Sequence, residues 1–280
     1  MAKMKTDKPI QQYAQEWQDN AQVDPLWVIL TDSDKKQKKW DENDFFETGR
    51  EEIRRFFDYL CRQRIELANA GRFLDFGCGV GRLSRALIER FDSGVGIDIS
   101  PHMVDLANKY NARDQKKIDF LVNQSANLSQ IPSDSVDFIY SHIVLQHMQP
   151  SLQLQFIAEF LRILRPAGIA AFQIVTGQLP SFKSRVKNML PHDLKERLLT
   201  LLGRKESGVV FEMNLLPESE IMTIAMESHC SILAAPYTNS TDKAHGGKLE
   251  FLTKECAMEK IRSAQTHSEY LSQFFIVRKP

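Results

Sequence analysis

The sequence predicts an α/β fold: a doubly wound, mostly parallel sheet with helices on both faces, preceded by a helical extension. Between residues 69 and 177, short runs rich in β-branched and aromatic residues alternate with segments of helical periodicity. Strands that are joined by crossover helices form parallel sheets, and such sheets bind ligands at the carboxyl ends of their strands. Residues 1–68 show only helical spacing, so we divide the chain into an extension (1–68) and one α/β domain (69–280).

Composition excludes several classes of protein. The 280 residues are 42% hydrophobic, and 36 Lys plus Arg balance 36 Asp plus Glu, so net charge gives no reason to expect a nucleic-acid partner. The cysteines are far apart and form no C-x-x-C pair, which argues against a metal site or disulfides and fits a reducing compartment. They are Cys61, Cys78, Cys230 and Cys256. No apolar run approaches 18 residues and the N-terminus lacks the apolar region of a signal peptide, so we expect a cytoplasmic protein without stable membrane insertion.

The elements follow in order along the chain. The extension is broken by the charged stretch DSDKKQKKWDEND (32–44) and ends in an amphipathic helix. The predicted strands of the domain are 72–76, 94–99, 118–123, 136–141 and 168–176, and the predicted helices between them are 82–91, 101–110 and 150–164. Ser100 is expected to cap the second of these helices, with Pro101 at its first position.

The last hundred residues are less regular. A basic insertion is expected at about 178–208, because residues 181–207 contain seven Lys or Arg against three acids. It includes a short helix that Gly203 would end, and a solvated face explains its charge better than a membrane surface does. Beyond it we predict a helix over 217–228 and strands over 231–238 and 272–280.

The stretch FLDFGCGVGRLS (73–84) is a glycine loop between a predicted strand and a predicted helix. A P-loop is excluded because the sequence has no Lys for the phosphates. The dinucleotide pattern G-x-G-x-x-G requires a third glycine at residue 82 or 84, where the sequence has Arg82 or Ser84. Neither register fits well, although the strand–loop–helix context would suit a dinucleotide.

Two carboxylates favour a cationic nucleoside instead. Asp75 lies at the end of the first predicted strand, where its negative charge opposes a pyrophosphate but suits an ammonium or sulfonium group. Asp98 lies 21 residues after Gly77, at the tip of the next strand, where a carboxylate accepts hydrogen bonds from ribose hydroxyls. S-adenosylmethionine carries an ammonium, a sulfonium and a ribose, so it fits both groups.

Four segments in order resemble the motif series of class I S-adenosylmethionine-dependent methyltransferases. They are LDFGCGVGRLS, GIDIS, SVDFIYSHIVLQHM and LRILRPAG, and the resemblance covers residues 72–176. It implies a Rossmann-like, seven-stranded sheet and methyl transfer from S-adenosylmethionine. The N-terminal stretch resembles the helical extension of a bacterial subset that acts on small molecules. The RPAG segment departs from the usual K/R-P-G-G, but Pro166 and Gly168 still suit a type I turn.

The resemblance also implies roles for individual residues. Asp75 and the backbone of the glycine loop would hold the methionine part, and Asp98 the ribose hydroxyls. The further cofactor-binding residues are Gly77, Cys78, Gly79 and Gly81 in the loop, Ile99 and Met103 against adenine, Asn127 and Leu128 at the adenine amino group, and Ser141 beside the transferred methyl group. Four residues of the extension either form a lid over the cofactor or pack helices together, namely Trp27, Trp40, Phe46 and Thr48.

Two histidines follow the fourth predicted strand, and they are the catalytic candidates. Methyl transfer is an in-line displacement in which the enzyme supplies orientation, and a base if the acceptor must lose a proton. In some sugar O-methyltransferases of this fold a His at the position of His147 acts as that base, so His147 is the first candidate and His142 the second. Alternatively, His147 caps a helix or packs under the sheet, and His142 contributes only backbone contacts.

The absence of two motifs restricts the class of methyl acceptor. The fourth strand ends in YSHIV, not in the D/N-P-P-Y/F of enzymes that methylate amino groups of DNA bases, and no Pro-Cys nucleophile occurs there. We therefore expect a small-molecule acceptor and favour an oxygen of a sugar or secondary metabolite over the nitrogen of a small amine. A nicotinamide-dependent oxidoreductase and a non-catalytic cofactor-binding protein stay open, and binding of S-adenosylhomocysteine but not NAD separates them from the methyltransferase.

Overall fold

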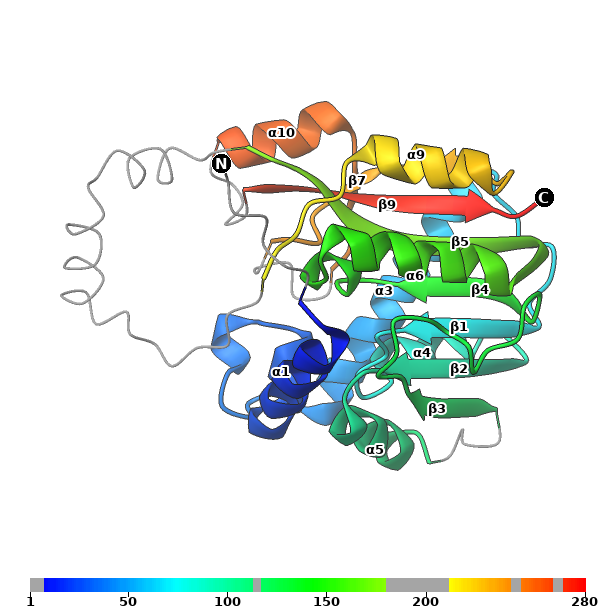
Figure 1. The fold of residues 1–280 in the computed structure, drawn as a ribbon. Coiled ribbons are helices and arrows are strands. Elements are labelled where there is room, and N and C mark those ends of the chain that lie inside the picture. Colours follow the sequence, from blue (N-terminus) through cyan, green and yellow to red (C-terminus); the bar gives the residue numbers. More distant parts are fainter. Residues whose placement is uncertain (1–7, 113–116, 180–211, 243–247, 264–268) are drawn as a thin grey trace.

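The computed structural model describes residues 8–112, 117–179, 212–242, 248–263 and 269–280 (Figure 1). The predicted basic insertion lies almost wholly outside these residues. The helices are α1 (Ile10–Val23), α2 (Pro25–Ile29), α3 (Glu42–Arg62), α4 (Arg82–Leu87), α5 (Pro101–Tyr110), α6 (Pro150–Ile163), α9 (Glu218–Glu227) and α10 (Lys254–Arg262). The strands are β1 (Arg72–Phe76), β2 (Ser93–Asp98), β3 (Ile118–Val122), β4 (Val136–Ser141), β5 (Leu164–Gln178), β6 (Ser231–Ala234), β7 (Tyr237–Thr238), β8 (Phe251–Leu252) and β9 (Tyr270–Arg278).

These strands form one mixed sheet in the order β3-β2-β1-β4-β5-β9-β7-β8, with β6 also paired to β9. The first five strands of this order are parallel, and β9 runs antiparallel to β5. The predicted fold class is confirmed, but the described sheet has nine strands rather than seven. Part of the difference is one predicted strand that divides into β6 and β7, because Pro236 between them has no N–H to donate to a neighbouring strand.

Helices cover both faces of the sheet, as the alternating pattern predicts. Side chains alternate along each strand, so Leu74 packs on the face covered by α6 and α9, whereas Phe73 packs on the face covered by α3 and α4. Figure 1 shows α6 in front of the sheet and α3 behind it. The doubly wound arrangement leaves the carboxyl ends of β1, β2 and β4 together at one edge of the sheet.

The N-terminal extension has two different relations to the sheet. Helix α3 begins at Asp41, whose side chain accepts from the Asp44 N–H at 3.1 Å, and it buries its apolar side against α4. Gly49 permits this close approach, since a Cβ there would lie 2.5 Å from the Arg82 carbonyl oxygen. Helices α1 and α2 instead lie beyond the carboxyl edge, on the side toward α5 (Figure 1).

Two local expectations need correction. The RPAG segment was expected to form a type I turn, but Ala167 has a φ of +61°, which a type II turn requires at its third position and a type I turn does not. The helix predicted over 82–91 ends earlier, because α4 spans only Arg82–Leu87. By contrast, Ser100 caps α5 as predicted and accepts from the Met103 N–H at 3.2 Å.

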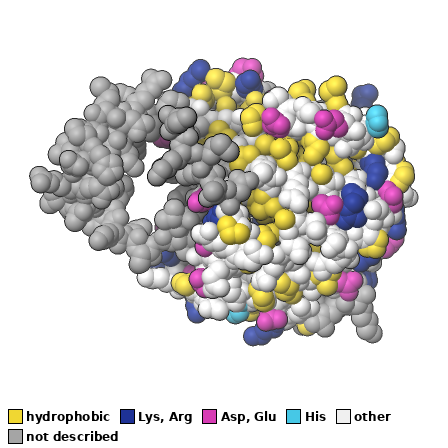
Figure 2. Space-filling view, in the orientation of Figure 1, with side chains coloured by type: hydrophobic (Ala, Val, Ile, Leu, Met, Phe, Trp, Pro, Cys, Tyr) yellow, Lys and Arg dark blue, Asp and Glu magenta, His cyan; other side chains and the backbone are white. Residues whose placement is uncertain are grey.

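The surface is mixed in charge. Figure 2 shows Lys and Arg interspersed with Asp and Glu over the visible face, in keeping with the zero net charge of the chain. Within the part of the chain that the structure describes, no helix is both long enough and apolar enough to cross a bilayer. All four cysteines are free thiols.

Candidate active site

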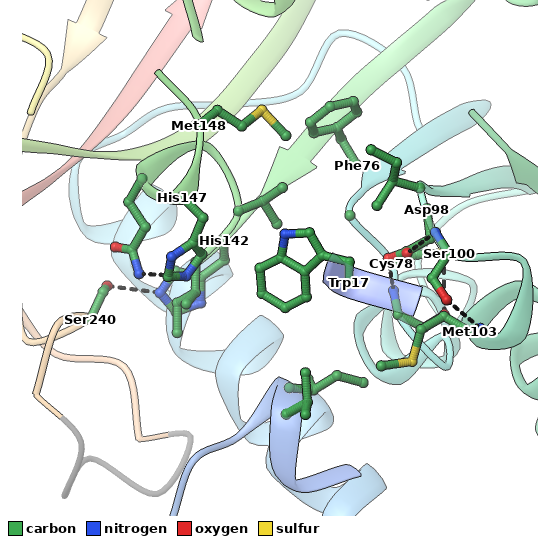
Figure 3. Close-up of a pocket in the computed structure, with 18 of the residues that line it drawn as sticks. Trp17, Phe76, Cys78, Asp98, Ser100, Met103, His142, His147, Met148 and Ser240 are labelled. Atoms are coloured by element: carbon green, nitrogen blue, oxygen red, sulfur yellow. Dashed lines mark hydrogen bonds between the residues drawn. The ribbon is translucent and has the colours of Figure 1, made fainter. Parts of the chain in front are cut away.

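A cavity of about 670 Å³ opens at the carboxyl ends of β1, β2 and β4. This volume lies within the range of roughly 300–1,000 Å³ that is common for small-molecule sites. The glycine loop and Asp98 line one side of the cavity, and the two histidines line the other (Figure 3). The extension lines it as well, through α1 and residues 28–32.

Three glycines of the loop have left-handed backbone conformations. The φ angles are +76° at Gly77, +53° at Gly79 and +82° at Gly81, values that glycine adopts without the strain a Cβ would bring. The Gly77 and Cys78 N–H groups donate to the Ile97 carbonyl oxygen at 2.8 and 2.9 Å. A Cβ on Gly79 would lie 2.6 Å from Cδ1 of Ile29, so the loop also packs closely against the extension.

Asp98 ends β2, and hydrogen bonds from the backbone fix its carboxylate at the cavity wall. Oδ2 accepts from the Gly79 N–H at 2.9 Å, and Oδ1 accepts from the Ser100 N–H at 2.9 Å. Burial raises the pKa of Asp98, while these hydrogen bonds act in the opposite direction. The arrangement links the loop to the strand end and holds an acceptor of hydrogen bonds at the cavity.

Asp75 lies behind the loop rather than at the cavity. Its side chain is buried and accepts from the Ser84 hydroxyl at 2.6 Å, and it is not among the described residues that line the cavity. Burial raises the pKa of this carboxyl to about 7, although the Ser84 hydrogen bond and the charge of Arg82 lower it. The loop residue Gly81 is likewise absent from the described cavity wall.

The other predicted cofactor residues divide into two groups. Ile99 and Met103 line the cavity. Three others are not among the lining residues that the structure describes: Asn127 is exposed, Leu128 is in the core, and the buried Ser141 donates to the Phe76 carbonyl oxygen at 3.1 Å. Asn123, directly after β3, does line the cavity, and its Nδ2 donates to the Ser125 and Asn127 carbonyl oxygens at 3.1 and 3.0 Å.

The extension covers the cavity with residues other than the four named from the sequence. Trp27, Trp40 and Phe46 pack together with α1, and Thr48 accepts from Arg82 at 3.3 Å. Helix α1 supplies Trp17, which lies between the glycine-loop side and the histidine side in Figure 3 and meets the His147 ring edge-on with centroids 5.5 Å apart.

Hydrogen bonds hold α1 at both ends of this cover. The Gln18 side-chain oxygen accepts from the Ser100 hydroxyl at 2.7 Å, at the beginning of α5. The Tyr13 hydroxyl accepts from the Gln149 N–H at 3.1 Å, at the beginning of α6. Helix α1 therefore bridges two helices that lie on either side of the cavity.

Both histidines line the cavity, but their surroundings differ. His142 follows β4, and its Nδ1 lies 2.6 Å from Oε1 of Glu52 while its Nε2 lies 2.7 Å from Oγ of Ser240. His147 lies in the short 3-10 helix Leu145–His147, with Nδ1 2.8 Å from the Glu212 carbonyl oxygen. Burial lowers the pKa of His147 to about 4, and the hydrogen bond to Glu212 opposes this only in part.

Sequence reasoning missed Glu52, Ser240 and Trp17. Glu52 offered a signal, since it falls at helical spacing among the apolar positions Gly49, Ile53 and Phe56 that α3 buries, and a charge on such a face needs a buried partner. Ser240 offered none, because it is 98 residues from His142 in the chain.

Comparison with known proteins identifies the fold and the class. Residues 74–172 match the family model described as "Methyltransferase domain". The chain is 29% identical over 137 residues to a trans-aconitate 2-methyltransferase from Azoarcus sp. (strain BH72), which covers 48% of this chain and 50% of the relative. It is 29% identical over 111 residues to a ubiquinone biosynthesis O-methyltransferase from Xanthomonas oryzae pv. oryzae, covering 40% of this chain and 45% of the relative. The chain thus spans about half the length of the curated relatives it matches.

A solved structure matches almost the whole chain. Magnesium protoporphyrin IX methyltransferase from Synechocystis PCC 6803, with bound SAH, covers 96% of this chain and 99% of its own with a TM-score of 0.56 and 15% identity. At that identity the likeness concerns the fold. The family model therefore assigns residues 74–172 to a methyltransferase domain, and the solved structure shows that the chain has the fold of an S-adenosylmethionine-dependent methyltransferase.

Proposed function

We propose that the protein transfers the methyl group of S-adenosylmethionine to an oxygen atom of a small molecule, such as a sugar or secondary metabolite. The observation that carries the proposal is the Asp98 carboxylate, held at the wall of the cavity by the glycine loop itself. A ligand with two vicinal hydroxyls can donate to such a carboxylate. The glycine loop beside it packs so closely that a Cβ on Gly79 would lie 2.6 Å from Cδ1 of Ile29.

In this proposal the residues of the cavity divide the cofactor among them. Asp98 accepts hydrogen bonds from the ribose, and Ile99 and Met103 pack against the adenine. Asn123 stands where a polar group can meet the adenine amino group, and the Asn127–Leu128 backbone that it holds shapes this end. The loop from Gly77 to Gly79, with Asp75 behind it and Gly81 completing its turn, takes the methionine part.

The acceptor is expected beside His142 and His147, past the end of β4 at Ser141. When bound, the cofactor supplies a methyl group on a positively charged sulfur. The protein's residues orient the acceptor toward it, exclude water and accept the acceptor's proton. Apolar side chains around the histidines, Trp17, Met148 and Phe156 among them, suit a largely apolar acceptor body.

Calorimetry with S-adenosylhomocysteine tests the cofactor assignment. We expect micromolar binding of S-adenosylhomocysteine and none of NAD. The Asp98→Asn variant should bind S-adenosylhomocysteine about 10- to 100-fold more weakly, because hydrogen bonds to a charged group contribute roughly 1.5–3 kcal/mol. Asp105→Asn, which removes an exposed carboxylate from α5, is the matched control. Binding of NAD in preference to S-adenosylhomocysteine would refute the proposal.

A further inference from the structure

Two histidines line the cavity, and the hydrogen bonds around them decide which ring nitrogen carries the proton. We propose that His142 accepts the proton of the methyl acceptor through Nε2, that Glu52 of the N-terminal extension positions it for this, and that the acceptor group is a neutral hydroxyl. The inference rests on the proposed function and adds to it the class of acceptor and a positioning residue.

Glu52 determines the protonation state of one ring nitrogen of His142, Nδ1. Its side chain is fully buried, with Oε2 2.7 Å from Arg82 and Oε1 2.6 Å from Nδ1 of His142. Burial by itself would raise the pKa of Glu52, but Arg82 and His142 outweigh it and hold that pKa well below its usual range. The Tyr140 hydroxyl also donates to Oε1, at 3.2 Å. An ionised carboxylate only accepts hydrogen bonds, so Nδ1 of His142 carries a proton.

A second chain of hydrogen bonds leads to the other nitrogen, Nε2, and is compatible with a lone pair on it. The Ile143 N–H donates to Oε1 of Gln173 at 3.2 Å, so the other side-chain atom of Gln173 is the amide nitrogen. That nitrogen lies 2.9 Å from Oγ of Ser272, which must accept from it. The Ser272 hydroxyl can therefore donate its own proton to Thr238.

The proton direction then passes along three hydroxyls. Oγ of Ser272 lies 2.9 Å from Oγ1 of Thr238, and Thr238 lies 2.7 Å from Oγ of Ser240. With Ser272 donating to Thr238 and Thr238 to Ser240, the Ser240 proton points to Nε2 of His142 at 2.7 Å. This direction of the hydroxyls and the carboxylate of Glu52 fit the same tautomer, in which Nε2 has a lone pair.

His147 has the same tautomer but a different partner. Its Nδ1 must donate to the Glu212 carbonyl oxygen, so Nε2 accepts from the side-chain nitrogen of Gln146, 3.2 Å away. The Gln146 oxygen is fixed in turn by the Gln173 amide at 3.1 Å. Where His142 meets a carboxylate, His147 meets a backbone carbonyl and an amide, and burial lowers its pKa to about 4, so His147 is a weak base.

This difference between His142 and His147 assigns the proton transfer to His142. A hydroxyl of the acceptor takes the place of Ser240 as donor to Nε2 of His142. As the acceptor oxygen forms its bond to the methyl carbon, its proton passes to Nε2, and the carbon–sulfur bond breaks with its electron pair remaining on sulfur. Glu52 stabilises the imidazolium that forms. An alcohol or phenol needs this base, whereas a carboxylate, already ionised at neutral pH, does not.

The tautomer is tested first, on the unmodified protein. Two-bond ¹H–¹⁵N correlation spectra at pH 8 should show Nδ1 of His142 protonated and Nε2 unprotonated, with the signals assigned by comparison with His142→Gln. In Glu52→Gln this preference should be lost, whereas Glu51→Gln, which removes the neighbouring half-buried carboxylate that pairs with Arg54, should retain it. A proton on Nε2 of His142 in the unmodified protein would overturn the inference even if S-adenosylhomocysteine binds.

The acceptor class is tested by supplying the protein with S-adenosylmethionine and one of four possible acceptors of similar size, and by measuring the S-adenosylhomocysteine formed. The four compounds are p-cresol, benzyl alcohol, phenylacetate and benzylamine. We expect release with a hydroxyl compound. With that compound, His142→Gln and Glu52→Gln should lower kcat by about 10²-fold or more, change KM of the cofactor less than threefold, and leave S-adenosylhomocysteine affinity intact. The kcat of His147→Gln should stay at least tenfold higher than the kcat of His142→Gln.

Three results would contradict this inference: release with phenylacetate or benzylamine only, release with none of the hydroxyl compounds, or equal losses in the two histidine variants. Calorimetry distinguishes these three results from a failure of the proposed function. If the proposed function is wrong, the protein does not bind S-adenosylhomocysteine, whereas the three results concern a protein that does bind it.

Discussion

Replacing Asp75 by Asn should make the free energy of unfolding of the protein less dependent on pH. Asp75 is buried at the end of β1, and its pKa is raised from 3.8 to about 7, mainly by burial. Between these two values the folded chain holds a proton on Asp75 that the unfolded chain has lost. The free energy of unfolding therefore falls as pH rises through this window.

The magnitude follows from the shift. Each pH unit inside the window changes the contribution of Asp75 by about 1.4 kcal/mol. From pH 5 to pH 7 the free energy of unfolding falls by about 2–3 kcal/mol. This is less than the full change for two pH units, because Asp75 is already half ionised in the folded protein near pH 7. Asparagine has nearly the same shape, stays neutral and can still accept from Ser84, so Asp75→Asn should escape this loss.

Urea unfolding at pH 5, 6 and 7 measures the effect as a difference between the two proteins. His147 contributes in the opposite direction, since its pKa is lowered to about 4 in the folded state and its contribution to stability is lost as pH falls, but it does so equally in both proteins. Asp105→Asn controls for the removal of one charge. If the difference between Asp75→Asn and the unmodified protein is the same at pH 5 and pH 7, the carboxyl of Asp75 is not neutral in the folded state.

Three further predictions concern the cavity. Gly79→Ala should lower the free energy of unfolding by at least about 1–2 kcal/mol, because the φ of +53° strains an L-residue and Cδ1 of Ile29 must move; unchanged urea unfolding would contradict it. S-adenosylhomocysteine should change tryptophan emission, and Trp17→Phe should remove most of that change in a fluorescence titration; a full change in the variant would show that Trp17 is not the reporter. Asn123→Ala should weaken S-adenosylhomocysteine binding about 3- to 10-fold in calorimetry by freeing the 125–127 backbone, and equal affinity would separate Asn123 from the site.

The sequence predicted the central sheet well because the signals for it are local. Each strand from β1 to β4 is a short, largely apolar run, and α4, α5 and α6 begin at a cap, a proline or a glycine that the sequence displays. The division of the last strands was harder, since it depends on pairing with β9 at the end of the chain. Likewise α10 was not predicted, because its segment is polar and only two of its side chains are buried.

For the site, local reasoning found the groups that a motif fixes and missed those brought together by packing. Asp98 and the loop glycines follow from spacing along one strand–loop–helix unit. The partner of His142 could not be found in this way, because Glu52 is 90 residues away and belongs to a helix of the extension. His147 came first from the sequence because the resemblance to sugar O-methyltransferases favoured it, whereas the hydrogen-bond partners that distinguish the two histidines are visible only in the structure.

The extension therefore has two separate relations to the site, and they depend on different helices. Helix α3 is packed into the core on one face of the sheet and carries Glu52 to His142, so this contact is as rigid as the core itself. Helix α1 instead covers the cavity: Trp17 lines it, the hydrogen bonds of Gln18 and Tyr13 join α1 to the beginnings of α5 and α6, and the buried Ala21 packs in a cluster with Met103 of α5.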